Sequence, residues 1–213
     1  MNFDTLRYVV VEGPIGVGKT SLARRLAERL GGQTLMEQPQ ENPFLEKFYR
    51  DGARHALPTQ MFFLFQRMQQ LRELAQGDLF DGRVVSDFLL DKDPIFAELT
   101  LDDDELNLYR QLYNHLRPQA PVPDLVLYLQ AEPATLLERI ERRGIAMETA
   151  ISAQYLHRLC ESYSRFFHHY DTAPILIVNN EHWNPLQRDE DFELLIERIG
   201  TMRGRREFFN RGE

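Results

Sequence analysis

Residues 7–30 read RYVVVEGPIGVGKTSLARRLAERL, and this stretch decides the fold. Positions 13–20 within it match the pattern G-x-x-x-x-G-K-[ST] in full. The apolar run before the motif is typical of a buried strand, and the spacing of apolar residues after it predicts an amphipathic helix. Glycines let the backbone curl so that its N–H groups and the positive end of the helix face an anion. The stretch therefore predicts a strand, a phosphate-binding loop and a helix, which together form a nucleoside triphosphate site.

The residues of this loop have separate expected tasks. Lys19 is expected to reach the β- and γ-phosphates, and the Thr20 hydroxyl is expected to ligate Mg²⁺. The alternative is a chance match in an unrelated loop, which the flanking strand and helix argue against. The residues expected to bind the triphosphate are Gly13, Pro14, Ile15, Gly16, Val17, Gly18, Lys19, Thr20 and Ser21.

The rest of the chain alternates apolar, β-branched runs with long amphipathic stretches. This pattern predicts an α/β domain with a parallel sheet flanked by helices, and we expect one domain over residues 1–213. Five strands are expected, at 7–12, 33–37, 83–87, 125–130 and 175–179. Helices are expected at 18–30, 57–75, 103–116, 133–142, 152–170 and 190–203.

Three connections are expected to be long or irregular loops, at 39–54, 88–101 and 144–151. In open parallel sheets, ligands lie beyond the carboxyl ends of the strands. The first two loops leave such ends directly, so we expect them to hold the substrate. The tail GRREFFNRGE at 204–213 is expected to dock its phenylalanines on the body or on a second subunit.

Composition and charge exclude several classes of protein. The 213 residues are 43% hydrophobic and 27% charged, which excludes global disorder. No apolar run approaches the ~20 residues of a membrane span, and the N-terminus lacks the features of a secretory signal. The single cysteine, Cys160, excludes an internal disulfide framework or a multi-cysteine metal site. We therefore expect a cytoplasmic protein without a membrane partner, and the net charge of -8 disfavours binding to nucleic acid.

Two acidic residues end predicted strands near the phosphate loop. Glu37 could take a proton from an attacking hydroxyl or hold that hydroxyl in line with the γ-phosphate. Its alternative is a solvated glutamate at a strand end. Asp87 stands where enzymes with such a loop place an acid near Mg²⁺, and its alternative is a helix cap.

Gln60 and Arg67 lie seven residues apart, on one face of the predicted helix 57–75. Their neighbours are apolar, so both side chains should be buried and should need polar partners. One interpretation is that they face the edge of a nucleobase. An internal polar network without a ligand is the alternative.

Arg139, Arg142 and Arg143 close the predicted helix 133–142 ahead of Gly144. Arginines that fold over a transferring phosphoryl group stabilise its charge. The alternative is a solvated basic helix end, which the helix dipole favours.

Taken together, these segments resemble the deoxyribonucleoside kinase family, and in particular its bacterial deoxyadenosine and deoxyguanosine kinase-like branch. The resemblance spans nearly the whole chain and depends on the order of several motifs. It implies a phosphate-loop kinase fold with a lid at about 139–150, ATP and Mg²⁺ as cofactors, and a homodimer. It further implies ATP-dependent phosphorylation of the 5′-hydroxyl of a deoxynucleoside, with purines favoured. The motifs are EGPIGVGKTSLA (12–23), ENPFLEKFYRD (41–51), LPTQMFFLFQR (57–67), SDFLLDKDPIFA (86–97), PDLVLYLQA (123–131), ERIERRG (138–144) and YLHRLCESYSRFF (155–167).

The resemblance also implies roles for residues on the acceptor side. Glu37 matches the general base that acts on the 5′-hydroxyl, while Tyr49 and Glu148 match the pair that holds the 3′-hydroxyl. The nucleobase-reading residues of the family are matched by Gln60 and Arg67.

Other matches concern stacking and the donor side. Phe96 matches the aromatic residue that stacks on the base. Arg139 and Arg143 match lid arginines that approach the ATP phosphates. Asn180 lies in a segment, 179–181, that resembles the loop contacting the adenine through its backbone.

The sequence departs from the family at three places. Residues 86–88 read Ser-Asp-Phe where many members have Glu-Arg-Ser, so the arginine is absent and Asp87 is the only acid there. We assign Asp87 to Mg²⁺ or to the 5′-hydroxyl. Ile145 replaces a lid arginine. Lys92 stands where animal members carry an aspartate facing the base, and an ammonium cannot accept a hydrogen bond; Asp91 and Asp93 flank it.

Two alternatives to a nucleoside kinase remain at this stage. A nucleoside monophosphate kinase of the thymidylate kinase type would need basic residues for the phosphate of its acceptor. The set Glu37, Tyr49 and Glu148 suits a neutral sugar instead. A nucleotide-binding module that has lost catalysis and regulates a partner is the other alternative, supported by the missing arginine and the reduced lid.

Overall fold

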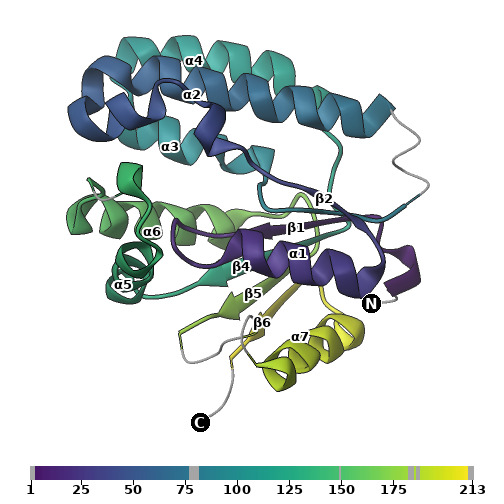
Figure 1. Cartoon of the computed structure of the whole chain (residues 1–213). Helices are drawn as coiled ribbons and strands as arrows, with labels where there is room; N and C mark the ends of the chain where they lie inside the picture. The colour runs from purple at the N-terminus through teal and green to yellow at the C-terminus, as the bar shows by residue number, and fades with distance from the viewer. Residues whose placement is uncertain (1–2, 77–81, 149, 182–184, 186–187, 211–213) are drawn as a thin grey trace.

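The computed structural model describes residues 3–76, 82–148, 150–181, 185 and 188–210. Its centre is a six-stranded parallel sheet with the strand order β2-β3-β1-β4-β5-β6 (Figure 1). The strands are β1 (Tyr8–Glu12), β2 (Gln33–Leu35), β3 (Val84–Ser86), β4 (Leu125–Gln130), β5 (Ile175–Asn179) and β6 (Arg206–Phe209).

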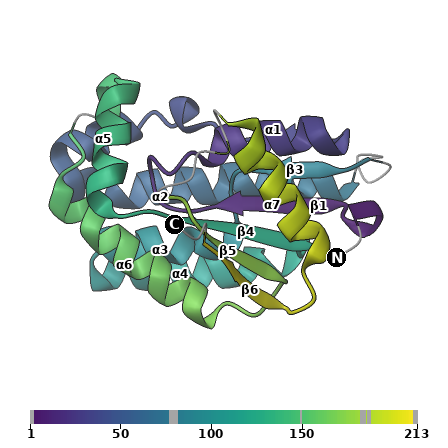
Figure 2. The same ribbon diagram turned by 90° about the horizontal axis from the view of Figure 1, so that it is seen from below.

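Helices cover both faces of the sheet. Helices α1 and α7 lie on one face, while α2, α3, α4 and α6 lie on the other (Figure 2). Helix α5 follows β4 at the carboxyl end of the strands. The helices are α1 (Lys19–Leu30), α2 (Leu45–Gln76), α3 (Asp93–Thr100), α4 (Asp103–Leu116), α5 (Pro133–Arg143), α6 (Ala153–His169) and α7 (Asp189–Thr201).

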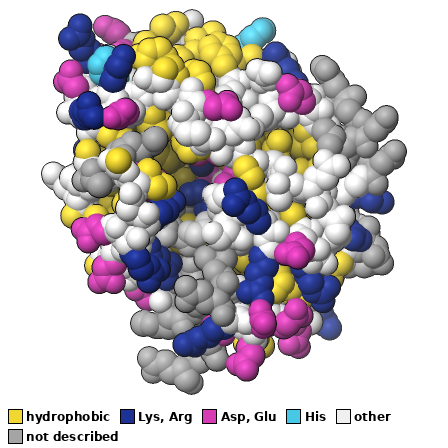
Figure 3. Space-filling view, viewed as in Figure 1, with side chains coloured by type: hydrophobic (Ala, Val, Ile, Leu, Met, Phe, Trp, Pro, Cys, Tyr) yellow, Lys and Arg dark blue, Asp and Glu magenta, His cyan; other side chains and the backbone are white. Residues whose placement is uncertain are grey.

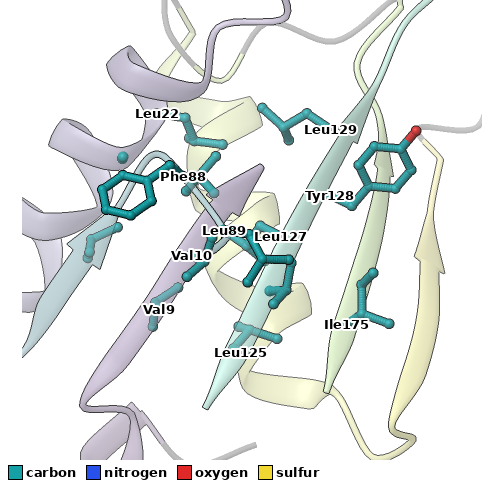
Figure 4. Close-up of a cluster of buried hydrophobic side chains, with 14 of the residues drawn as sticks. Val9, Val10, Leu22, Phe88, Leu89, Leu125, Leu127, Tyr128, Leu129 and Ile175 are labelled. Carbon is teal, nitrogen blue, oxygen red and sulfur yellow. The ribbon is translucent and has the colours of Figure 1, made fainter. Parts of the chain in front are cut away.

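The core forms on both sides of the central strands. Strands β1 and β4 are buried along almost their whole length, and parallel strands covered on both faces are apolar in this continuous way. Figure 4 shows Val9 of β1 with Leu125 and Leu127 of β4, which the register places on one face of the sheet, in a cluster that also contains Leu22 of α1. On the other face, Tyr128 stacks on Phe167 of α6 with 4.0 Å between the ring centroids.

The strand order explains where a ligand can bind. Strand β1 lies between β3 and β4. Strands β2 and β3 lie on one side of β1 and strands β4, β5 and β6 on the other, so the strand order reverses beside β1. Such a reversal opens a crevice at the carboxyl ends of the strands. The phosphate loop, residues 13–18, connects β1 to α1 at this point.

The predicted parallel α/β fold is confirmed, but the expected number of strands was wrong. Residues 206–209 of the tail form a sixth strand beside β5. The tail therefore docks on the body of its own chain, although Phe208 remains 62% exposed. Because β6 is a short edge strand rich in charged residues, its pattern did not indicate a strand. Residues 211–213 lie outside the described part of the chain.

Two of the expected loops were wrong. Within 39–54, a 3-10 turn is followed by α2, which begins at Leu45 and bends at Asp51 (φ -135°, ψ 46°). Within 88–101, residues 93–100 form α3. Pro94 occupies the first turn of α3, where a missing N–H costs nothing.

Strands β2 and β3 are shorter than expected. Glu37 and Asp87 therefore follow their strands and do not form part of them. Among the described residues, no helix has the length and apolar character needed to cross a membrane.

Candidate active site

A cleft opens at the carboxyl ends of the strands, between the phosphate loop and the helices α2 and α3. It encloses about 900 Å³ including its open mouth, which suits a small-molecule ligand. Figure 3 shows the hollow near the centre of this face, with basic side chains beside it. The cleft is lined by Ile15, Gly16, Lys19, Thr20, Glu37, Pro39, Leu45, Phe48, Tyr49, Thr59, Gln60, Phe63, Arg67, Asp87, Lys92, Phe96, Arg143, Glu148 and Tyr155.

The phosphate loop has the backbone that its glycines predict. Gly16 has φ +86°, and a Cβ atom there would lie 2.8 Å from the carbonyl oxygen of Leu136. Gly18, with φ 99°, precedes the first residue of α1. The Nζ atom of Lys19 lies 3.2 Å from the carbonyl oxygen of Pro14. The loop thus has the curled form and the helix N-terminus that bind phosphate.

Thr20, Asp87 and Glu37 are connected at the base of the cleft. The Thr20 hydroxyl donates a hydrogen bond to Oδ2 of Asp87, and the backbone N–H of Glu37 donates to Oδ1 of the same carboxylate at 2.7 Å. A hydroxyl and a buried carboxylate are the hard oxygen ligands that Mg²⁺ prefers. These two side chains therefore fit a magnesium site beside the phosphate loop.

The Glu37 carboxylate faces two cations. Its Oε1 atom accepts a hydrogen bond from Nε of Arg67 at 2.8 Å and lies 3.8 Å from Nζ of Lys92. Burial raises the pKa of Glu37, but the two cations outweigh burial and lower the pKa to about 2. Glu37 is therefore an anion throughout the neutral range.

The far end of the cleft combines aromatic and polar side chains. Gln60 and Arg67 both line it, as their spacing predicts, together with Phe63 and Phe96. The Nε2 atom of Gln60 donates to the Thr100 hydroxyl at 3.3 Å. Planar apolar walls with a few buried polar groups suit an aromatic ring with polar edges, such as a nucleobase.

Asp93 lies beside Arg67 at the same end. The Arg67 guanidinium forms a buried ion pair with Asp93 as well as with Glu37. Burial raises the pKa of Asp93 to about 6, although Arg67 opposes the shift. Of the two acids that flank Lys92, Asp93 is thus the one that pairs with Arg67, although it does not itself line the cleft.

Tyr49 and Glu148 meet at the side of the cleft, where Tyr155 also lines it. Burial raises the pKa of the Tyr49 hydroxyl, and the neighbouring Tyr155 and Glu148 raise it further. Glu148 forms an ion pair with Arg143. A neutral hydroxyl and a carboxylate here can hydrogen-bond a sugar hydroxyl.

The lid arginines differ in position. Arg143 lines the cleft, whereas Arg139 lies outside it and donates a hydrogen bond to the backbone oxygen of Asn180 at 2.9 Å. The Asn180 side chain in turn donates to the backbone oxygen of Val17 at 2.8 Å. Arg139 and Asn180 thus meet behind the phosphate loop. Thr149, within the expected lid, lies outside the described residues.

Glu12, Phe63 and Tyr155 were not predicted from the sequence as site residues. Glu12 is fully buried and forms an ion pair with Lys92, with 3.2 Å between Nζ and Oε2. Glu12 could have been noticed in the sequence because it is the single charged residue at the end of an apolar run, directly before the phosphate loop. Phe63 and Tyr155 gave no signal, because aromatic residues on an amphipathic helix are usually core residues.

The fold and the site define a class of protein: a phosphate-loop protein whose cleft extends from the loop to a lining of aromatic and polar side chains on α2 and α3. Comparison with known proteins then identifies the family. A family model described as deoxynucleoside kinase matches residues 9–202. The chain therefore belongs to the deoxynucleoside kinase family and is an enzyme of that type, as the resemblance implied.

Individual relatives agree with this assignment. The chain is 37% identical to deoxyguanosine kinase of Bacillus subtilis over 161 residues, which cover 75% of this chain and 78% of the relative. It is 30% identical to deoxyadenosine/deoxycytidine kinase of the same organism over 202 residues, covering 91% and 92%. A structure of deoxyadenosine kinase from M. mycoides with dCMP and dCDP bound has a TM-score of 0.80 and 25% identity, covering 92% of this chain and all of that one.

Proposed function

We propose that this protein transfers the γ-phosphoryl group of Mg·ATP to the 5′-hydroxyl of a purine deoxynucleoside. The observation that carries the proposal is that the Glu37 carboxylate lies in the same cleft as Lys19 and Thr20 of the phosphate loop. A nucleoside in this cleft has its base near Gln60 and Arg67 and its 5′-hydroxyl near Glu37.

The proposed reaction is an in-line displacement. The 5′-oxygen forms a bond to the γ-phosphorus, the bond from that phosphorus to the β,γ-bridging oxygen breaks, and ADP leaves. Glu37 orients the hydroxyl and accepts its proton as the new bond forms. Lys19 and Arg143 lie where they can bind the phosphates, and Tyr49 and Glu148 hold the sugar. Arg139 and Asn180 lie behind the phosphate loop, where we place the adenine end of ATP.

Magnesium is expected at Thr20 and Asp87, where it would neutralise charge on the β- and γ-phosphates. Asp87→Asn is predicted to weaken activation by Mg²⁺ roughly 10–100-fold, because an amide lacks the negative charge of the carboxylate. The measurement is the turnover rate as a function of free Mg²⁺ at saturating nucleoside. Asp104→Asn, an exposed residue of α4, is the matched control. An unchanged Mg²⁺ requirement in Asp87→Asn would contradict the assignment.

The preference for purines is supported by the relatives and by the polar groups at the base end of the cleft. Arg67 supplies donors, and the Gln60 amide supplies both a donor and an acceptor. A guanine or adenine edge offers complementary groups. Lys92, which cannot accept a hydrogen bond, is directed toward Glu12 and Glu37 and away from this task.

The experiment that tests the function measures phosphate transfer from Mg·ATP to a panel of acceptors. The panel contains the four deoxynucleosides, the matching ribonucleosides and thymidine monophosphate. We expect turnover of deoxyguanosine or deoxyadenosine above the pyrimidines, and none of the monophosphate. Turnover of the monophosphate alone would show that the protein is a nucleoside monophosphate kinase. The absence of all turnover would show that it is a nucleotide-binding module without catalysis.

We also propose that residues 1–213 form one kinase domain with its lid at about 139–150, and that the enzyme is a homodimer, as the resemblance implies. A cytoplasmic location fits an enzyme that consumes ATP. Sedimentation equilibrium tests the dimer by whether the mass in solution is twice the 25.1 kDa of the chain.

A further inference from the structure

Lysine is rare in this chain and is concentrated in the cleft. It occurs at positions 19, 47 and 92 alone, and two of these three residues line the cleft. Lys92 is only 2% exposed. Its Nζ atom lies 3.2 Å from Oε2 of Glu12, 3.8 Å from Oε1 of Glu37 and 5.6 Å from the centroid of the Phe96 ring. A buried ammonium is costly unless it is paired, so this position requires an explanation.

Glu12 pairs with the Lys92 ammonium but cannot accept hydrogen bonds from all three of its N–H groups. The Glu12 carboxylate already accepts hydrogen bonds from the backbone N–H groups of Gly13 and Leu89, both at 2.8 Å, and from the Tyr163 hydroxyl at 3.2 Å. An ammonium has three N–H donors, and the two Glu12 oxygens can take at most two of them. At least one donor therefore remains for the cleft, on the side of Glu37.

The same carboxylate fixes the position of the Lys92 ammonium relative to the phosphate loop. Through Gly13, Glu12 is bonded to the first residue of the phosphate loop, and through Leu89 to the connection that carries Lys92. Burial lowers the pKa of Lys19, and the Lys92 ammonium lowers it further, so the two ammonium groups are near enough to interact. Lys92 thus lines the same cleft as the proposed base, Glu37, and as Lys19 of the phosphate loop.

We propose that Lys92 is a catalytic residue whose ammonium contacts the acceptor 5′-oxygen and the transferring phosphoryl group, and that Glu12 is the positioning residue that aims it. The inference rests on the kinase function proposed above. Residues 86–88 carry no cation at the end of β3, so Lys92 supplies positive charge that this strand end lacks. The proton of the 5′-hydroxyl goes to Glu37, and Lys92 lowers the energy of the negative charge as it passes between oxygens.

The experiment compares Lys92→Met with the double variant Glu12→Gln/Lys92→Met. Lys92→Met keeps the length of the side chain but leaves Glu12 as an unpaired buried charge, so it is expected to lose both stability and activity. The double variant removes that charge as well. We expect it to regain part of the melting temperature, because the buried charge is gone and the amide oxygen still accepts from one of the two backbone N–H groups. We expect kcat to stay roughly 10²–10³-fold below that of the unchanged protein, the usual effect of losing one charge-stabilising group.

Two further measurements separate catalysis from structure. Lys92→Arg, which keeps the cation, is expected to restore part of kcat. A bisubstrate analogue that joins deoxyguanosine to adenosine through a 5′,5′-pentaphosphate is expected to bind the double variant more weakly, with little change in the Kd of either nucleoside or ATP alone. Lys47→Met, an exposed lysine of α2, is the matched control.

The outcomes are distinct. Recovery of kcat together with stability in the double variant would show that Lys92 serves only as the counterion of Glu12. Unchanged affinity for the bisubstrate analogue would also overturn the proposal. If the protein without substitutions phosphorylates no deoxynucleoside, that result would overturn the proposed function, and the role of Lys92 with it.

Discussion

Glu37→Gln is expected to lower kcat by roughly 10²–10⁴-fold while ATP binding and the fold are preserved. Glutamine has the shape of glutamate but cannot accept the proton of the 5′-hydroxyl. Arg67 keeps its buried partner Asp93 in this variant, so no cation is left wholly unpaired. The measurements are kcat with saturating deoxynucleoside and the Kd of Mg·ATP by calorimetry.

The matched control for this prediction is Glu46→Gln. Glu46 lies on α2 near the cleft, and its side chain is 60% exposed and paired with Arg50. The control should keep the kcat of the unchanged protein. If Glu37→Gln kept kcat within a few-fold, Glu37 would have no part in proton transfer or in orienting the acceptor.

Arg67→Met is expected to lower the free energy of unfolding by about 3–5 kcal/mol, the usual effect of removing one partner from a buried ion pair. Arg67 is 4% exposed and is paired with both Glu37 and Asp93, so the substitution leaves two carboxylates in the interior with less compensation. Chemical denaturation at neutral pH measures this loss. Arg72→Met, an exposed position on the same helix, should change stability by less than about 1 kcal/mol.

The loss should depend on pH, because two carboxyl groups change their pKa. In the unchanged protein, the pKa of Glu37 is about 2, below its usual 4.5, so its pairing stabilises the fold above about pH 4.5 and ceases to do so as the pH falls toward 2. Without Arg67, burial should raise the pKa of both Glu37 and Asp93. The stability difference between Arg67→Met and the unchanged protein should therefore be larger at pH 7 than at pH 4. A difference that shrinks as the pH rises would show that Arg67 does not hold these carboxylates ionised.

Much of the site was predictable because its signals are local. The phosphate loop demands glycine at fixed positions, and Gly16 and Gly18 have the positive φ values that their spacing in the motif indicated. Gln60 and Arg67 line the same cleft because two helical turns separate them. The central strands were predictable because parallel strands covered on both faces are continuously apolar.

Other features have no local signal. The sixth strand exists only because β5 offers its edge to residues 206–209, in which two charged residues are followed by two aromatic ones without the alternation typical of a strand. Helix α3, where a loop was expected, packs against α2, α4 and α6, and such contacts have no signal in the local sequence. The direction of Arg139 toward Asn180, and away from the cleft, likewise depends on the approach of the loop after β5.

The sequence by itself determined the phosphate loop, the parallel α/β fold and the kind of residue at each strand end, because these follow from backbone requirements and from spacing along one element. Only the tertiary structure decided which charges meet. Glu12 and Lys92 are 80 positions apart, and Glu37 and Arg67 are 30 apart. Spacing within an element fixes the direction of a side chain relative to that element. The charge that a side chain faces across the cleft depends on how separate elements pack.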